Sequence, residues 1–306
     1  MQSTVSKTVY FSGAGLHTGR LVRLAVHPAD ANHGIVFHRT DLSGAHAILP
    51  ARWDLVDQTP LCTRLLNGAG VTVSTIEHLM ASLAGLGVSN ARIDIDGPEV
   101  PILDGSAAPF VRKLVAAGVV AQGVEARILK VLKPVEVVVG DASARLDPAD
   151  GFHIDFDITF TDAAIGHQHL SLNMRNGAFV RVLCDSRTFC RQADVDEMRA
   201  RGLALGGTHF NAVVFDGGAV LSPGGLRHAN EPVRHKMLDA LGDLSLAGGP
   251  ILGRYTGVRA GHAMTNKLLR KLFADPTAYS WVDCDAHTAS SLPGVGVRQA
   301  DLALSA

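Results

Sequence analysis

The chain has 306 residues, of which 47% are hydrophobic and 19% charged, enough apolar material for about two domains with sizeable cores. The formal net charge of −1 and the pI of about 6.9 provide no basic field that would attract nucleic acid. The four cysteines form no CxxC pair, which argues against a cysteine zinc site and a disulfide scaffold, and favours a reducing compartment.

The N-terminal residues show no apolar segment of a signal peptide, and no run of about 18 apolar residues occurs in the sequence. We therefore expect a cytoplasmic protein with no stable membrane insertion and no nucleic-acid partner. Histidine is plentiful, with 14 copies, and several lie beside acidic residues. Metal or acid–base chemistry is therefore the function class to test.

The first part of the chain has the pattern of several strands followed by a helix, a strand and a second helix. Strand-like runs cover 8–12, 22–27, 34–38, 61–65 and 90–96, and a helix is predicted over 107–117. The glycine-rich segment 13–19 lacks the spacing and the lysine of a phosphate-binding loop, so a hairpin turn is predicted there. Another helix is predicted over 74–87, with Ser74 and Glu77 forming a capping box at its start.

A similar order of elements restarts near 122–127. Strand-like runs cover 129–140, 143–146, 152–160, 168–172, 212–215 and 251–259, and helices are predicted over 194–201, 230–247 and 264–273. The run 178–183 is ambiguous between strand and helix, and the tail after residue 285 is expected to be irregular. This repetition predicts an α+β protein with two domains of related plan, residues 1–125 and 126–306.

The helix predicted over 230–247 carries the densest set of functional side chains. On a helical wheel, the apolar residues between 237 and 244 gather on one side, and His235, Asp239 and Asp243 lie on the other. The i, i+4 spacing puts an imidazole beside a carboxylate, as two ligands of one divalent metal ion require. The same polar stripe is typical of any surface helix, and on spacing alone that interpretation is the more common one.

The pair Glu77-His78 and the separate His262 suggest how a metal site could become catalytic. If His78 joins His235 and Asp239 as a ligand, a tetrahedral ion keeps its fourth position open for water, which is the pattern of catalytic zinc sites. Glu77, next to a ligand, is then placed to take a proton from that water. His262 could donate a proton to a leaving nitrogen, so the set fits hydrolysis of an amide.

Each candidate also has an ordinary interpretation. Asp243, which could hold an imidazole in its charged form, is one more residue of a polar helix face. The other ordinary readings are Glu77 as a capping partner, His78 as a helix-surface histidine, His262 as a helix cap, Thr188 as a strand or turn threonine, Lys236 as a solvated cation and Cys62 as a buried inert thiol.

Short motifs spread along residues 13–270 weigh against these ordinary interpretations. They are GLHTG at 15–19, STIEHL at 74–79, PILDGS at 101–106, RTF at 187–189, the glycine-bounded 202–207, VRHKMLD at 233–239 with GD at 242–243, and GH at 261–262. Together and in this order they resemble the zinc-dependent UDP-3-O-acyl-N-acetylglucosamine deacetylases of bacterial lipid A synthesis. Any one motif is weak, whereas the ordered set is specific.

This resemblance implies a role for each candidate residue. His78, His235 and Asp239 match the zinc ligands, Glu77 the general base, His262 the general acid, and Asp243 the acidic residue that pairs with that histidine. Thr188 matches a hydroxyl that helps zinc to stabilise the oxyanion, and Lys236, Phe189 and Cys62 match positions that line the substrate site. The implied cofactor is Zn²⁺, with Fe²⁺ as the alternative in the cell, since two histidines and one carboxylate suit both ions.

The resemblance also implies a fold and a reaction. The fold would be α+β, with two domains of similar plan, each a β-sheet packed on a helix layer, and the active site between them. An inserted subdomain near 189–215 would form a tunnel for the acyl chain. The reaction would be removal of the N-acetyl group from UDP-3-O-acyl-N-acetylglucosamine, with release of acetate, as an early committed step of lipid A biosynthesis. The expected partner is this small-molecule substrate, and the protein is expected to be a monomer.

Two other functions remain open at this point. One is a zinc amidohydrolase of the same fold that acts on a different acylated amino sugar. The other is a non-enzymatic binding module whose histidine and aspartate residues are structural. Glu77 and His262 argue against the binding module, because a purely structural metal site needs neither a general base nor a general acid.

Overall fold

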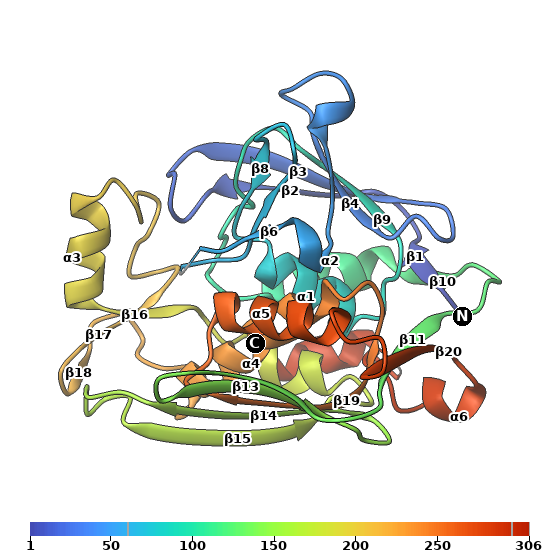
Figure 1. The fold of residues 1–306 in the computed structure, drawn as a ribbon. Coiled ribbons are helices and arrows are strands. Elements are labelled where there is room, and N and C mark those ends of the chain that lie inside the picture. Colours follow the sequence, from blue (N-terminus) through green and yellow to red (C-terminus); the bar gives the residue numbers. More distant parts are fainter. Residues whose placement is uncertain (60, 295, 306) are drawn as a thin grey trace.

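The computed structural model describes residues 1–59, 61–294 and 296–305, with side chains described up to Leu302. Two β-sheets lie on opposite sides of a central group of helices (Figure 1). The first sheet has the strand order β2 (Val9–Ala14), β3 (Leu21–Pro28), β9 (Ala91–Ile95), β4 (Ile35–Arg39) and β5 (Ile48–Pro50). Neighbouring strands run antiparallel except β9 and β4, which are parallel.

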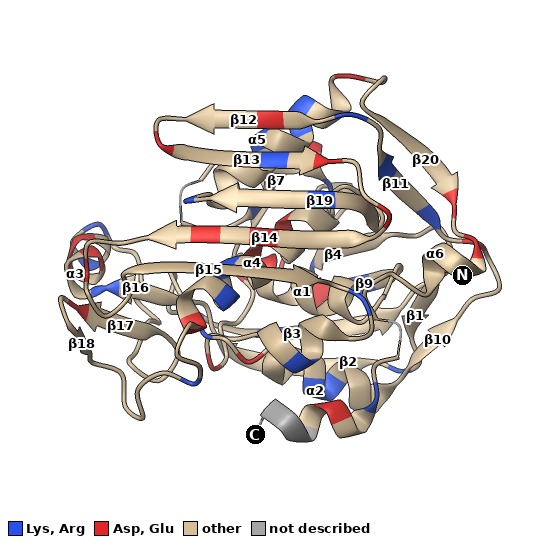
Figure 2. Cartoon of the chain, turned by 90° about the horizontal axis from the view of Figure 1, so that it is seen from below, with Lys and Arg blue, Asp and Glu red and all other residues tan. Residues whose placement is uncertain are grey.

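The second sheet is built from the later part of the chain. Its order is β12 (Val135–Val139), β13 (Ala142–Asp147), β19 (Ile251–Val258), β11 (Arg127–Val131) and β20 (Tyr279–Asp283), and β14 (Phe152–Thr159) joins β19 to β15 (His167–Asn173). Strand β19 is central, because it pairs in parallel with β11 and β14 and antiparallel with β13. Figure 2 shows this sheet from outside, with acidic and basic residues interspersed along its strands.

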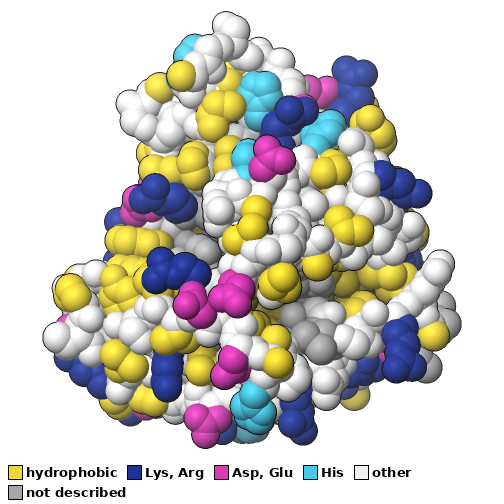
Figure 3. Space-filling view, turned by 90° about the vertical axis from the view of Figure 1, so that its right-hand side faces the viewer, with side chains coloured by type: hydrophobic (Ala, Val, Ile, Leu, Met, Phe, Trp, Pro, Cys, Tyr) yellow, Lys and Arg dark blue, Asp and Glu magenta, His cyan; other side chains and the backbone are white. Residues whose placement is uncertain are grey.

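Short strands and turns complete the fold. The strand pair is β1 (Ser3–Val5) with β10 (Val119–Ala121), and the small sheets are β6 (Val56–Asp57), β7 (Arg64–Leu66) and β8 (Thr72–Val73), and β16 (Phe189–Arg191), β17 (Val213–Asp216) and β18 (Ala219–Val220). The short helical turns are η1 (Ala45–Ala47), η2 (Trp53–Leu55), η3 (Phe179–Leu183) and η4 (Gln299–Ser305). On the face shown in Figure 3, cationic side chains are scattered, and several lie beside acidic ones instead of forming one field. No helix among the described residues has the length and apolar character needed to cross a membrane.

The central helices position the candidate site. They are α1 (Glu77–Gly85), α2 (Ala108–Ala117), α4 (Glu231–Ser245) and α5 (His262–Phe273), while α3 (Gln192–Ala200) and α6 (Ala286–Ala289) lie outside this group (Figure 1). Helix α1 is buried on nearly all sides, as expected for a helix without a continuous polar face. It packs directly against α4, so residues about 160 positions apart in the sequence become neighbours.

Gly242 permits this close packing of α1 and α4. A Cβ atom at this position would lie 2.2 Å from the carbonyl oxygen of Glu77. Gly242→Ala would gain about 1 kcal/mol of helix propensity. The clash with backbone costs more, so we expect a net loss of about 1–3 kcal/mol in the free energy of unfolding. Urea denaturation measures this loss. Gly218→Ala is the control, because a Cβ there meets open space, and an equal loss in both variants would contradict the packing argument.

The α+β fold class is confirmed, and most predicted elements occur within a few residues of their expected ends. The hairpin turn at 13–19 is also confirmed, because it joins the antiparallel strands β2 and β3. The division into domains 1–125 and 126–306 stays a prediction; the chain passes between the two sheets in the connection from β10 to β11.

Other details of the sequence prediction were wrong. The capping box is absent, because α1 begins at Glu77 without a side-chain cap and the hydroxyl of Ser74 donates to the carbonyl oxygen of Pro98 at 3.0 Å. The run 129–140 is two strands, β11 and β12. The run 178–183, left open between strand and helix, is helical, because it forms the π-helical turn η3. The tail is not simply irregular: η4 folds back, where Asp301 lies 3.4 Å from the guanidinium of Arg181.

Candidate active site

Three side chains converge between the helices. His78 lies in the first turn of α1, and His235 and Asp239 lie one turn apart on α4. One ligand atom from each falls within 4.8 Å of the other two. Asp239 Oδ1 is 3.3 Å from His235 Nε2 and 3.6 Å from His78 Nε2, and all three residues are buried. The structure therefore brings together the three residues predicted to bind a metal ion.

The state of these side chains fits a divalent cation. Asp239 Oδ1 is buried without a hydrogen-bond partner among the described residues, which is costly unless a positive charge faces it. Burial is the main cause that lowers the pKa of His78 to about 3, and burial also lowers the pKa of His235. Both imidazoles are therefore neutral, with a nitrogen lone pair for a metal ion. Two histidines and one carboxylate form the donor set of catalytic zinc sites.

Contacts around the ligands fix their orientation. His235 Nδ1 donates to the carbonyl oxygen of Ser186 at 2.9 Å, which leaves Nε2 with a lone pair that could bind a metal ion. Lys236 Nζ lies 3.3 Å from Asp239 Oδ2. Burial by itself would raise the pKa of Asp239, but the facing imidazole of His235 and the charge of Lys236 outweigh burial and lower it. Asp239 is therefore an ionised carboxylate.

A carboxylate and an imidazole suited to proton transfer lie beside this ligand set. Glu77 Oε1 is 3.9 Å from His262 Nε2, and Glu77 Oε2 accepts a hydrogen bond from the backbone N–H of Thr63 at 3.0 Å. Burial raises the pKa of Glu77 to about 7, although the nearby charge of His262 opposes this. The carboxyl group of Glu77 is thus a proton acceptor of near-neutral pKa.

His262 begins α5 and is held by Asp243 of α4. Its Nδ1 lies 2.9 Å from Asp243 Oδ2, and Asp243 Oδ1 also accepts the hydroxyl hydrogen of Thr63. Burial alone would lower the pKa of His262, but Asp243 and Glu77 outweigh it and raise that pKa to about 9. At neutral pH the imidazolium therefore presents Nε2–H towards the ligand set.

The residues expected to line a substrate site lie at different depths. The Phe189 ring centroid is 6.4 Å from that of His235, with the planes nearly perpendicular, and Lys236 is mostly buried beside Asp239. Burial raises the pKa of Cys62 to about 12, so its thiol is neutral. Thr188 is partly exposed and lies two residues after Ser186; its backbone N–H donates to the carbonyl oxygen of Gly105 at 2.8 Å.

Several residues that shape the site were missed from the sequence. Thr63 links Glu77 and Asp243, because its N–H donates to Glu77 and its hydroxyl donates to Asp243. Ser186 accepts from His235 through its backbone carbonyl, and a backbone contact cannot be read from the type of side chain. The GLHTG motif forms a turn that docks on the predicted insertion, where the N–H groups of Leu205 and Gly206 donate to the carbonyl oxygens of His17 and Leu16. A Cβ at Gly206 would lie 2.2 Å from the carbonyl oxygen of Gly15, which explains the glycine there.

Comparisons with known proteins agree with this arrangement. The family model described as UDP-3-O-acyl N-acetylglycosamine deacetylase matches residues 2–274. A protein of Phenylobacterium zucineum (strain HLK1) is 51% identical over 278 residues, which cover 91% of this chain and 95% of that protein. Proteins of Shewanella frigidimarina (strain NCIMB 400) and Shewanella baltica (strain OS155) are 48% and 46% identical, over 93% and 97% of this chain and 93% and 98% of their own lengths.

All three relatives are named UDP-3-O-acyl-N-acetylglucosamine deacetylase, a hydrolase that acts on an amide. The matched span includes α1, α4 and the start of α5, which carry the buried histidine and carboxylate cluster. The family resemblance stated from the motifs is therefore confirmed. This chain belongs to the UDP-3-O-acyl N-acetylglycosamine deacetylase family of metalloenzymes.

Proposed function

We propose that this protein hydrolyses the N-acetyl group of UDP-3-O-acyl-N-acetylglucosamine, releasing acetate and leaving a free amine on the sugar, as an early committed step of lipid A biosynthesis. One observation supports the chemistry: the carboxylate of Glu77 and the imidazole of His262 lie beside the buried cluster of two histidines and one aspartate. The substrate is inferred from the names of the relatives.

His78, His235 and Asp239 would hold the metal ion. Zn²⁺ is the proposed cofactor and Fe²⁺ the alternative in the cell, since this donor set suits both. When bound, such a cation supplies Lewis acidity, which polarises the amide carbonyl and makes a water molecule more acidic.

Glu77 acts as the general base in this proposal. Thr63 holds one of its oxygens, so the other is available to take a proton from the attacking water. The water oxygen bonds to the acetyl carbon, and the carbonyl oxygen gains negative charge. The hydroxyl of Thr188 donates a hydrogen bond to that oxyanion.

His262 then completes the reaction as the general acid. Its Nε2–H gives a proton to the sugar nitrogen, the C–N bond breaks, and acetic acid and the amine separate. Asp243 stabilises the imidazolium before this transfer, because its carboxylate lies 2.9 Å from Nδ1. The acetic acid loses its remaining proton to become acetate, Glu77 gives its proton to solvent and His262 takes one up from solvent, so both residues regain their starting states.

The remaining roles are inferred on the same basis. Phe189, which lies beside His235, together with Lys236 and Cys62, is proposed to line the substrate site, and the insertion near 189–215 to receive the acyl chain. The two parts 1–125 and 126–306 are proposed as separate domains of similar plan. The protein is proposed to work as a monomer in the cytoplasm on this small-molecule substrate.

An assay of acetate release tests the proposal. UDP-3-O-acyl-N-acetylglucosamine is compared with UDP-N-acetylglucosamine, which lacks the acyl chain, while bound metal is quantified. Rapid release from the acylated substrate is expected, with loss of activity on chelation and recovery on adding Zn²⁺. Activity restricted to other acylated amino sugars would instead support the alternative amidohydrolase, and full activity after metal removal would overturn the metal role.

The dependence of kcat on pH gives a separate prediction. Glu77 must be ionised to accept a proton, so kcat should rise with pH through its pKa, which burial raises to about 7. His262 must be protonated to donate, so kcat should fall as pH rises through its pKa of about 9. Burial alone would lower the pKa of His262, but the carboxylates of Asp243 and Glu77 outweigh burial and raise it. Added positive charge lowers both pKa values, so the maximum is expected within or below this interval. A flat profile from about pH 5 to pH 9 would contradict the acid–base pair.

A further inference from the structure

Residues 185–188 form a short segment between η3 and β16 that supports the site from one side. The carbonyl oxygen of Ser186 accepts the hydrogen bond of 2.9 Å from His235 Nδ1. Two residues later, Thr188 carries the hydroxyl proposed to stabilise the oxyanion. The position of this backbone therefore sets both the direction of the His235 ring and the place of Thr188.

A buried ion pair anchors the segment to α4. Arg187 donates from Nε and Nη2 to the two carboxylate oxygens of Glu231, at 2.9 and 3.1 Å, and its backbone N–H donates to Glu231 Oε1 at 2.9 Å. Glu231 is 0% exposed and Arg187 5%. Glu231 is the first residue of α4 and lies one turn before His235. The same helix thus holds Arg187 through Glu231 and contacts Ser186 through His235.

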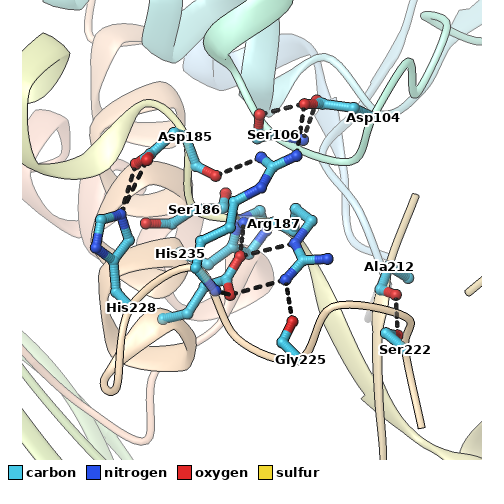
Figure 4. A network of polar contacts seen from close by, with 12 residues as sticks. Asp104, Ser106, Asp185, Ser186, Arg187, Ala212, Ser222, Gly225, His228 and His235 are labelled. Carbon is cyan, nitrogen blue, oxygen red and sulfur yellow. Dashed lines mark hydrogen bonds and ion pairs between the residues drawn. The ribbon is translucent and has the colours of Figure 1, made fainter. Parts of the chain in front are cut away.

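Arg227 reinforces this arrangement from the loop before α4. Its backbone N–H donates to Glu231 Oε2 at 2.7 Å, and its guanidinium donates to the carbonyl oxygen of Asp185 at 2.6 Å and to Asp104 at 3.0 Å. Figure 4 shows Asp104, Asp185, Ser186, Arg187 and His235 in this network. Asp104 belongs to the PILDGS motif of the first part of the chain, for which the proposed chemistry gives no use.

Thr188 is held from the same motif. Its N–H donates to the carbonyl oxygen of Gly105 at 2.8 Å, and its own carbonyl oxygen accepts from Val213 at 2.8 Å. Gly105 has a φ of +85°, and a Cβ there would lie 2.0 Å from the carbonyl oxygen of Asn211, so only glycine fits. Asp185, Arg187 and Thr188 are thus each held by hydrogen bonds, so the backbone is fixed on both sides of the Ser186 carbonyl.

The chemistry of Glu231 favours a positioning role over a contribution to stability alone. Burial by itself would raise the pKa of Glu231, but the Arg187 side chain and backbone donors outweigh burial and lower it, so the carboxylate stays ionised. A buried ion pair is often no more stabilising than apolar residues of the same size. A two-pronged guanidinium–carboxylate contact also fixes the orientation of the two side chains relative to each other.

We propose that Glu231 is a positioning residue: through Arg187 it fixes the 185–188 backbone, so that Ser186 orients the metal ligand His235 and Thr188 faces the reacting carbonyl. This inference rests on the proposed function. Glu231 acts through these neighbours and is not assigned any contact with the substrate.

Glu231→Gln tests this role, with Asp41→Asn as the matched control. Asp41 also accepts a two-pronged contact from a buried arginine, Arg39, at 2.8 and 2.7 Å, but in the turn that follows β4 of the first sheet. Both variants are loaded with Zn²⁺, and the rate of metal release to a chelator is measured along with kcat, KM and the thermal midpoint. For Glu231→Gln we expect metal release to accelerate about 10- to 100-fold and kcat to fall about 10-fold or more with KM little changed. Asp41→Asn should release metal at the wild-type rate.

A double variant separates positioning from stability. Arg187→Met combined with Glu231→Leu removes both charges, so no unpaired guanidinium stays buried and the thermal midpoint is expected to lie above that of Glu231→Gln. Fast metal release and low kcat should persist, because the backbone is no longer held. Recovery of metal retention together with stability would overturn the proposal, as would wild-type metal release in Glu231→Gln.

If Glu231→Gln does not fold, the double variant replaces it, because it leaves neither charge of the pair buried without a partner. That variant should show the same direction of change in metal release, and an unchanged rate would again overturn the proposal. The proposed function fails separately, if the wild-type protein releases no acetate from the acylated substrate. The metal-release comparison needs no substrate and therefore still decides the role of Glu231.

Discussion

Replacing Glu77 with glutamine is expected to lower kcat by about 10²- to 10⁴-fold, the usual contribution of a general base. The amide keeps the shape of the side chain and can still accept from the N–H of Thr63, but it cannot take a proton at neutral pH. Glu77 is not one of the three residues proposed to bind the metal ion, so the bound metal should stay at about one ion per chain. Steady-state kinetics and metal quantification on the same sample measure both outcomes.

Glu136→Gln is a suitable control for this experiment. Glu136 is a half-exposed carboxylate of β12, 3.6 Å from the guanidinium of Arg145, on the second sheet. Its replacement should leave kcat within about 2-fold of wild type, as expected for a surface position. A near-normal rate for Glu77→Gln would show that another group accepts the proton, and the assignment of the base would then be wrong.

Loss of a proposed metal ligand is expected to have the other large effect. In His235→Ala, the remaining His78 and Asp239 give only two of the three protein donors. We expect Zn²⁺ affinity to fall by more than the 10- to 100-fold typical of an outer contact, and turnover to fall with it. A ligand that binds the folded state raises its stability, so Zn²⁺ should raise the melting temperature of the wild-type protein but not that of the variant.

His167→Ala provides the comparison for this variant. His167 also pairs with an aspartate, at 2.6 Å from Asp157, but its side chain is 63% exposed at the start of β15. This variant should bind Zn²⁺ and show the same thermal shift as the wild-type protein. An unchanged thermal shift in His235→Ala would mean that the ion binds elsewhere, and the ligand set proposed for α1 and α4 would be wrong.

Both predictions depend on side chains whose types are visible in the sequence. The i, i+4 pair of His235 and Asp239 follows from helical periodicity alone, because a helix brings such residues to one face whatever surrounds it. The strand and helix order and the ordered motifs likewise indicated the α+β class and the family. The helical periodicity is local, and each motif is compared with the family as a short segment, so neither depends on how the chain packs.

Local patterns failed where a residue had two possible partners. Ser74 and Glu77 have the spacing of a capping box, yet the carboxylate accepts from Thr63 and the serine donates to Pro98. The tail after residue 285 reads as irregular, yet η4 folds back to Arg181. In each case a contact distant in sequence replaced the local one that the pattern suggested, because packing decides which partner is within reach.

The sequence by itself determined the residue types of the site, the helices that carry them and the family of the chain. Only the tertiary structure decided that α1 lies against α4, which depends on the missing Cβ of Gly242 and brings His78 to within 3.6 Å of Asp239. It also decided that Glu231 and Arg187 hold the carbonyl of Ser186 against His235. Periodicity fixes which side chains share a face of one helix, whereas the meeting of different segments depends on the packing of the whole core.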